Sequence, residues 1–362
     1  MATVLSHEMD GESVANVGLS RFDNPAAETI WRELYQRNDE AIASLSPEWA
    51  EAVVAAGNFR SSPQFYEFDD GARAVLPLFT KGVGSLRYAW SPPPAWGFGG
   101  ILSDGAVTPA HLETIFAHLE TFPCLGVKIR PNPLTADLWA AGARPAWTSI
   151  PRCAHVVDLS GGFDAVRGRF HRNAHTNIRR ARRLGVEVDV GNSEGLIDEF
   201  HELLQLSFVR WARKQHEPAA LAHFRGMRRD SRSKFTTMAA RMGNRFRLYV
   251  ARAGGRPAAA ILVLADRQAH YTRGAIDEPL AGETKATDLL QATAIQDACR
   301  LGSTHYHMGE TGISRSIAQF KCRFGAVAVP YAEYRYERFP LARLDGFARG
   351  AVKRILGFRD AP

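Results

Sequence analysis

The chain has 362 residues and a formal net charge of +7. This length exceeds the roughly 250 to 300 residues at which a single hydrophobic core stops growing, which predicts two domains. The excess of basic residues favours anionic partners such as RNA, nucleotides, phosphorylated precursors or a membrane surface. The four widely spaced cysteines indicate neither a disulfide framework nor a zinc site. No apolar run approaches the ~20 residues of a membrane-spanning helix, so we expect a cytoplasmic protein.

The first elements follow from turn and cap signals. Ser46 is a good N-cap, Pro47 suits the first helical position and Gly57 suits a stop, which predicts a short helix. Residues 59–79 then predict a strand, a turn at Asp70 and Gly71, and a second strand. An amphipathic helix over residues 109–120 and an apolar strand over 125–129 complete this unit.

The same order of elements recurs later in the chain. Residues 246–274 predict three strands, with a turn at Gly254 and Gly255, followed by a helix over 287–302 and a strand over 304–309. We therefore predict an α/β fold of two tandem units with mixed sheets, as domains of residues 26–150 and 151–340.

Residues 341–362 alternate apolar and basic residues at helical spacing, which predicts a basic amphipathic C-terminal helix. Such a helix either associates weakly with an anionic membrane surface or packs on its own protein.

A basic helix is predicted over residues 168–185. Its apolar stripe consists of Ala174, Ile178, Ala181 and Leu184, and the opposite face carries Arg172, Thr176, Arg179, Arg180 and Arg183. Guanidinium groups at this spacing present forked donors to phosphate or carboxylate groups. The alternative is a solvated basic face.

Two further places favour a bound substrate. Residues 282–290 open the main helix of the second unit with Thr284 and Lys285, and a helix N-terminus binds phosphate well. Ordinary capping by Thr284 is the alternative. Tyr271 and Gly274 end the preceding strand, where glycine permits close backbone approach, although a simple turn explains them too.

The segment of residues 316–325, with the sequence SIAQFKCRFG, predicts an extended strand. On a strand Lys321 and Arg323 would share one side and line a surface or cleft. Phe320, Cys322 and Phe324 would point inward on the other side, so we expect Cys322 to pack and not to act as a nucleophile.

Few other residues suggest chemistry. Glu310, expected just past the strand, is a candidate general base, although such a glutamate is more often only solvated. His305 and His307 share a strand face, but no third ligand has a recognisable spacing, so we predict no metal site.

Several motifs together resemble a known family. The segments SPEWAEAV, AVLPLF, NIRRARRLGVEV, YTRGA, LLQATAIQDACRLG and FKCRFGA occur in the order seen in Fem-like proteins. These are aminoacyl-tRNA-dependent aminoacyltransferases that build peptidoglycan cross-bridges, with relatives described as BioF2-like GNAT acetyltransferases. The resemblance runs from about Ser46 to Tyr336 and is most specific in the second half.

The resemblance implies two tandem GNAT folds, with the substrate channel mainly on the second. The family's lysine in FKxxFG matches Lys321, which would stabilise the oxyanion that develops during acyl transfer. Its basic helix matches residues 172–183. The chain departs from the family at Tyr306–Gly309, where relatives carry a Tyr-Asp-Gly pattern, and at AGETKAT, which lacks the second glycine of a CoA-binding loop.

These observations predict an N-acyltransferase that forms an amide between an acyl or aminoacyl group and an amine. Its catalytic residues would be Lys321 and Glu310, and its substrate- or phosphate-binding residues would be Arg172, Arg179, Arg183, Tyr271, Thr284, Lys285 and Arg323. No cofactor would be bound permanently, because aminoacyl-tRNA, our first choice, or an acyl-CoA would serve as the donor substrate.

The expected acceptor is a peptide, peptidoglycan-precursor or other anionic, small-molecule or lipid-linked amine, and no DNA partner is expected. A CoA-dependent acetyltransferase of polysaccharide or secondary-metabolite synthesis is the first alternative. A non-catalytic binder of RNA or anionic glycan is the second.

Overall fold

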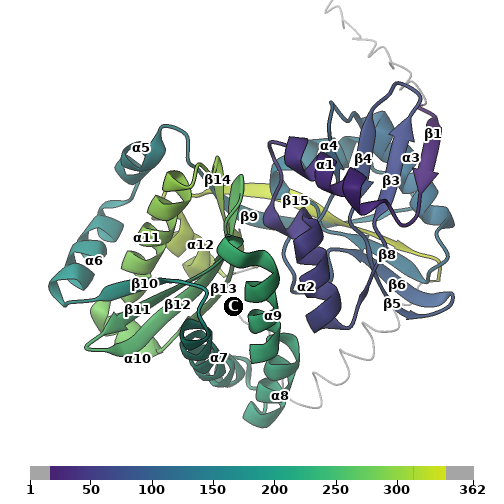
Figure 1. Cartoon of the computed structure of the whole chain (residues 1–362). Helices are drawn as coiled ribbons and strands as arrows, with labels where there is room; N and C mark the ends of the chain where they lie inside the picture. The colour runs from purple at the N-terminus through teal and green to yellow at the C-terminus, as the bar shows by residue number, and fades with distance from the viewer. Residues whose placement is uncertain (1–16, 313, 340–362) are drawn as a thin grey trace, which may run out of the picture.

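The computed structural model describes residues 17–312 and 314–339 (Figure 1). The N-terminal half contains β1 (Leu19–Asp23), α1 (Glu28–Arg37), α2 (Pro47–Gly57), β2 (Arg60–Ser61), β3 (Gln64–Phe68), β4 (Arg73–Leu76), β5 (Phe79–Val83), β6 (Leu86–Ser91), β7 (Leu102–Ser103), α3 (Pro109–Thr121), β8 (Gly126–Ile129), α4 (Ala136–Ala141) and β9 (Thr148–Asp158). The C-terminal half contains α5 (Gly162–Gly168), α6 (Arg172–Arg183), β10 (Glu187–Gly191), α7 (Glu194–Gln215), α8 (Ala219–Arg229), α9 (Arg232–Met242), β11 (Phe246–Ala253), β12 (Arg256–Leu264), β13 (Gln268–Ile276), α10 (Glu278–Thr284), α11 (Ala286–Arg300), β14 (His305–Glu310), α12 (Arg315–Cys322) and β15 (Val327–Glu337). Short 3-10 helices cover Ala43–Leu45, Pro133–Thr135 and Gly243–Arg245.

The predicted mixed α/β fold is confirmed. One sheet of eleven strands runs through both halves in the order β10-β11-β12-β13-β14-β9-β15-β8-β6-β5-β2. A second sheet of four strands, β1-β3-β4-β7, belongs to the N-terminal half. In the large sheet β13 is parallel to β14 and β6 is parallel to β8, and the other neighbouring strands are antiparallel. Each half thus contains one parallel pair of strands, which is consistent with a tandem repeat of one unit.

The two halves exchange their last strands at the centre of this sheet. β14 of the C-terminal half pairs with β9, the last strand of the N-terminal half. Conversely, β8 pairs with β15, the last described strand of the C-terminal half. β9 and β15 then pair with each other, from Val327 opposite Val156 to Arg335 opposite Thr148. Both strands lie between the halves in Figure 1. Each half therefore needs a strand of the other to complete its ladder of hydrogen bonds.

This strand exchange bears on the predicted domain boundary. The boundary expected between residues 150 and 151 falls inside β9, and the division into residues 26–150 and 151–340 stays a prediction. The helix predicted over residues 341–362 lies outside the described residues. No described helix combines the length and the apolarity that crossing a membrane demands.

Local sequence signals place most elements correctly. The Ser46 hydroxyl accepts a hydrogen bond from the backbone N–H of Trp49, so Ser46 caps α2 as predicted. The strands on either side of the Asp70 turn are β3 and β4, which pair as an antiparallel hairpin. The main helix of the second unit is α11, followed by Gly302 in the left-handed region, where a side chain would be strained.

The C-terminal part of the sheet is covered on both faces. On β11, Leu248 and Val250 join the core formed with α7 and α9, whereas Tyr249 and Ala251 join the core beneath α11. Because side chains alternate along a strand, a strand buried on both faces carries a nearly continuous apolar run. The apolar run at the end of β12 has the same cause.

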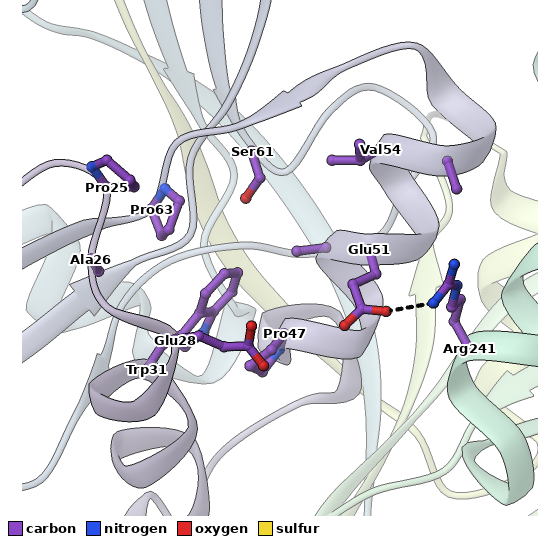
Figure 2. A pocket seen from close by; sticks show the side chains of 12 residues that line it. Pro25, Ala26, Glu28, Trp31, Pro47, Glu51, Val54, Ser61, Pro63 and Arg241 are labelled. Atoms are coloured by element: carbon purple, nitrogen blue, oxygen red, sulfur yellow. Dashed lines mark hydrogen bonds and ion pairs between the residues drawn. The ribbon is translucent and has the colours of Figure 1, made fainter.

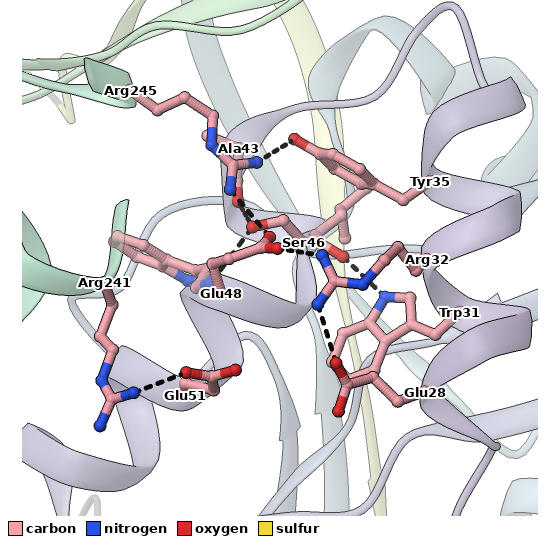
Figure 3. Close-up of polar contacts among 12 residues, drawn as sticks. Glu28, Trp31, Arg32, Tyr35, Ala43, Ser46, Glu48, Glu51, Arg241 and Arg245 are labelled. Atoms are coloured by element: carbon pink, nitrogen blue, oxygen red, sulfur yellow. Dashed lines mark hydrogen bonds and ion pairs between the residues drawn. The ribbon is translucent and has the colours of Figure 1, made fainter. Parts of the chain in front are cut away.

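Ion pairs join the two halves beside α2. Glu51 on α2 pairs with Arg241 on α9 at 3.0 Å (Figure 2). Glu48 pairs with Arg245 at 2.8 Å, and the Arg245 guanidinium also donates to the Tyr35 hydroxyl at 3.1 Å (Figure 3). Burial opposes ionisation of Glu48, but Arg245 and Arg32 lower its pKa to about 2. These contacts fix α1 and α2 against the C-terminal half.

The segment predicted as a strand over residues 316–325 is instead a helix, α12, followed by a turn. Ser314 caps the helix, and the sequence after it contains good helix formers and no β-branched run. Because adjacent residues of a helix lie about 100° apart around its axis, Lys321 is buried whereas Cys322 is exposed, which contradicts the predicted inward direction of Cys322. Phe324 is fully buried and Phe320 only partly.

Phe324 should hold α12 in place. It packs against Phe170 and Phe320, each with ring centroids 5.3 Å away. Phe324→Ala should lower the free energy of unfolding by about 3–5 kcal/mol, measured by urea denaturation. Phe224→Ala on α8, where 58% of the side chain is exposed, is the matched control and should change it by less than about 0.5 kcal/mol. Equal effects of the two substitutions would contradict this packing role.

Candidate functional site

An opening forms where β13 and β14 diverge. These parallel strands pair only between residues 268–270 and 305–307, although β13 continues to Ile276. The register between β12 and β13 shifts at this point, because Leu262 faces Arg273 and Val263 faces Tyr271, which leaves Thr272 as an extra residue. Such a bulge bends and twists its strand. Beyond the paired residues, β13 and β14 are no longer hydrogen-bonded to each other, and an opening lies between them.

A cavity of about 360 Å³ occupies this opening. Its volume is at the lower end of the range for small-molecule sites. Both halves supply its walls, which are formed by Ala95, Gly97, Phe98, Arg130, Trp211, His270, Tyr271, Thr272, Arg273, Gly274, Met308, Gly309, Glu310, Ile317 and Lys321. Three predicted site residues, Lys321, Glu310 and Tyr271, are therefore brought together here.

Lys321 reaches the opening from the last turn of α12. Its side chain is buried, and Nζ donates to the backbone oxygens of Gly309 at 2.8 Å and Glu310 at 2.9 Å. These carbonyls belong to the diverging end of β14, so they fix the ammonium at the mouth of the opening. An ammonium has three donors, and one remains for another acceptor. Burial lowers the pKa of Lys321 to about 8, although the Glu310 carboxylate acts in the opposite direction.

Glu310 lies at the end of β14 and not in a loop beyond it. Its Oε1 accepts a hydrogen bond from the Tyr331 hydroxyl and lies 3.9 Å from Nε of Arg130. Burial and the Glu310 charge raise the pKa of Tyr331, so this phenol remains a hydrogen-bond donor. Oε2 has no hydrogen-bond partner among the described residues, which leaves that oxygen available to a substrate. Tyr331 was not among the predicted site residues, because residues 327–337 show only a strand pattern.

Tyr271 and Gly274 depend on each other. The Tyr271 hydroxyl occupies the space where an added Cβ of Gly274 would lie, so a larger residue there would displace the phenol. Burial raises the pKa of Tyr271 to about 12. The group that lies close to the backbone of Gly274 is therefore the side chain of Tyr271.

Asp230 anchors one wall of the cavity. Its carboxylate is fully buried and pairs with Lys234 at 3.1 Å and with Arg273 at 3.2 Å. Both cations also donate to the backbone oxygen of Ala95, Arg273 at 2.9 Å and Lys234 at 3.3 Å. Burial opposes the ionisation of Asp230, but the surrounding cations hold its pKa below the usual range. We call these four residues the Asp230 clamp.

The clamp fixes a loop of the N-terminal half over the opening. Ala95 has φ +68°, a backbone conformation that costs free energy in a residue with a side chain. Ala95, Gly97 and Phe98 of this loop line the cavity, and the ring of Phe98 stacks on His270 with centroids 4.6 Å apart. Burial lowers the pKa of His270 to about 3, so this wall is neutral. No motif in the sequence pointed to the Asp230 clamp.

The other predicted phosphate-binding residues lie outside this cavity. Arg172, Arg179 and Arg183 are exposed on α6, and none has an ion-pair partner among the described residues. Thr284 ends α10 and donates to Leu280, so it does not cap α11 as the alternative interpretation required. Lys285, in the left-handed region, precedes α11 without capping it through its side chain.

Arg323 does not share the side of Lys321. The helical geometry turns it toward Asp288 in the first turn of α11, where it and Lys285 act on that carboxyl. Burial nevertheless raises the pKa of Asp288. The start of α11 thus gathers Thr284, Lys285 and Arg323 into a second, separate group of candidate residues.

A larger cavity, of about 660 Å³, lies between α1 and α2 (Figure 2). It contains none of the predicted site residues, and its carboxylates Glu28 and Glu51 are paired with arginines. Among residues 17–312 and 314–339, no cluster of three or more His, Cys, Asp or Glu side chains is arranged to bind a metal ion.

Removal of the buried Asp230 charge should strongly destabilise the protein. Asp230→Asn would leave Lys234 and Arg273 without their counter-ion, and should lower the free energy of unfolding by about 3–5 kcal/mol in urea denaturation. Adding Lys234→Met should restore part of this loss, because one of the uncompensated charges is removed. The control Asp198→Asn removes an exposed pairing with Arg232 and should cost at most about 1 kcal/mol. A neutral Asp230→Asn would contradict the clamp.

Comparisons with known proteins agree with this geometry. Residues 168–321 match the family model described as an acetyltransferase (GNAT) domain. The structure of FemX is similar with a TM-score of 0.63 and 12% identity, covering 89% of this chain and 99% of that chain. A protein of unknown function from Bacteroides thetaiotaomicron gives a TM-score of 0.54 at 11% identity, covering 87% and 98%.

These structural likenesses, at such low identity, show the fold alone. A search of curated proteins found no match. The matched domain contains α6, the diverging strands and Lys321. Residues 168–321 therefore match a GNAT acetyltransferase domain, and the fold of the chain is similar to that of FemX.

Proposed function

We propose that the protein transfers an aminoacyl group from aminoacyl-tRNA to the amine of a peptide, peptidoglycan-precursor or other cell-envelope acceptor. The observation that carries this proposal is the ammonium of Lys321, fixed by two backbone carbonyls at the opening between β13 and β14. The FemX-like fold supports the choice of an acyl-transfer site.

The proposed reaction begins with the acceptor amine attacking the ester carbonyl. A C–N bond forms, and the carbonyl oxygen becomes an oxyanion that the third donor of Lys321 stabilises. A positioned donor of this kind contributes about 2.7–4 kcal/mol to the transition state. The amine proton passes to Oε2 of Glu310, while Tyr331 orients that carboxylate through Oε1. The C–O bond to tRNA then breaks, and the leaving oxygen takes a proton back from Glu310.

The choice of donor rests on α6. Arg172, Arg179 and Arg183 present exposed guanidinium groups that no described acid neutralises, which suits the phosphates of RNA. An acyl-CoA is the second candidate, because the N-terminus of α11 lies beside Lys285 and Arg323, and a helix N-terminus favours phosphate. In that case a C–S bond breaks. Both donors belong to the cytoplasm, where we place the reaction.

Donor consumption tests the proposal. The protein is incubated separately with charged tRNA and with acyl-CoA species, together with a mixture of amine acceptors, and amide formation is followed. We expect consumption of charged tRNA, and a fall of about 10²- to 10³-fold in kcat for Lys321→Met. Lys214→Met, an exposed lysine paired with Glu278, is the control and should leave kcat unchanged.

Two outcomes would contradict the proposal. Consumption of acyl-CoA alone would select the second donor. Binding of tRNA with no transfer, and equal behaviour of Lys321→Met and the wild type, would favour a non-catalytic RNA binder.

The pH dependence of transfer should show the titration of Lys321. Its pKa is lowered to about 8, so the stabilising ammonium is present below this pH and is lost as the pH rises through it. The value of kcat/KM should therefore rise as the acceptor amine deprotonates and fall above about pH 8. In Lys321→Arg, the residual activity should lack the alkaline fall, because a guanidinium stays charged. An unchanged fall in this variant would assign it to another group.

A further inference from the structure

Three arginines share one buried carboxylate beside the cavity. Oε2 of Glu333 accepts from Arg130 at 2.7 Å and from Arg152 at 3.1 Å, and Oε1 accepts from Arg335 at 3.4 Å. Only 5% of Glu333 is exposed. The four residues come from three adjacent strands, since Glu333 and Arg335 lie on β15, Arg152 lies on β9 and Arg130 follows β8. Two carboxylates, those of Glu333 and of Glu310 at 3.9 Å from Nε of Arg130, therefore face three guanidinium groups.

Several donors of this cluster are unused. Nε of Arg152 and Nε of Arg335 are buried without a hydrogen-bond partner. Nη1 of Arg130 has no hydrogen-bond partner among the described residues, and Arg130 lines the cavity. A buried N–H without an acceptor is costly, so such groups are normally satisfied. The cluster has the donors that an additional anion would need.

The cavity itself carries the same excess of positive charge. Its walls contain the cations Arg130, Arg273 and Lys321 but only one carboxylate, that of Glu310. Asp230, the counter-ion of Arg273, does not neutralise this excess of positive charge, because the same carboxylate also pairs with Lys234. A positive field attracts an anionic group and also lowers the pKa of a nearby amine. The second effect favours the neutral amine that acyl transfer requires.

We propose that the acceptor is an amine that also carries an anionic oxygen group, a carboxylate or a phosphate, and that Arg130 binds this group. Arg152 and Arg335 lie behind it and add positive charge. A guanidinium forms strong, charge-assisted hydrogen bonds with either group. Because Nε and Nη2 of Arg130 already donate to Glu333, Nη1 is the nitrogen left to donate to the substrate. This inference rests on the proposed function, since it names the substrate class of the same site.

Chain-matched acceptors test the inference with whichever donor the protein consumes. The panel contains 5-aminopentanoate, its amide, aminobutyl phosphate and pentylamine. The anionic amines should have values of kcat/KM about tenfold or more above those of the neutral amines. The more active anion then tells carboxylate from phosphate. Arg130→Gln should remove most of this preference by raising KM, whereas Arg256→Gln, a control with 74% of its side chain exposed, should keep it.

A second measurement uses only the wild-type protein, in case Arg130→Gln fails to fold. Pentanoate should inhibit the transfer competitively with the acceptor, and pentanamide should not. Equal use of anionic and neutral amines, or equal inhibition by the acid and its amide, would overturn the inference and leave the transferase proposal intact. If no amine in the panel or in a broader mixture is acylated from any donor, the proposed function fails instead.

Discussion

The antiparallel pairing of β9 with β15 is the constraint on which the rest of the structure depends. Each of these strands completes the ladder of the other half, so the two repeats share one sheet. Main-chain hydrogen bonds across this centre fix the relative position of the halves far more tightly than a surface contact would. As a result, residues that follow β8 and the loop after β6 lie within reach of an opening formed by β13 and β14. The cavity is a product of both repeats.

Charge is distributed unevenly around that cavity. Two buried carboxylates, Asp230 and Glu333, are each surrounded by more than one cation, and both groups touch the walls. The first group holds a backbone carbonyl in place, and the second retains unused donors. Lys321 differs from both, because main-chain oxygens and not a carboxylate hold it. An ammonium without a directly bound carboxylate keeps more of its field for a substrate.

Much of the fold follows from local sequence signals, whereas the site follows only in part. Caps and glycine stops locate α2 and α11, and alternation locates the hairpins, because these signals act within a few residues. The exchange of β9 and β15 depends on contacts nearly 200 residues apart in sequence, which no local pattern records. The strand expected around Lys321 was wrong because alternation over a few residues does not separate a strand from a capped helix. That error also misplaced Arg323. Lys321, Glu310 and Tyr271, which were predicted on separate segments, line one cavity. Asp230, Arg130 and Tyr331 needed the folded chain.

The loop after β6 makes the two repeats unequal. In the C-terminal repeat, β13 continues beyond its pairing with β14 and supplies backbone to the cavity wall. In the N-terminal repeat, the chain leaves β6 at Ser91 and crosses to line the same cavity. The contacts that hold Lys321 and the loop that lines the opposite wall of the cavity therefore lie on separate stretches of sequence. Substitutions in the loop after β6 therefore change the shape of the cavity without touching the contacts that hold Lys321.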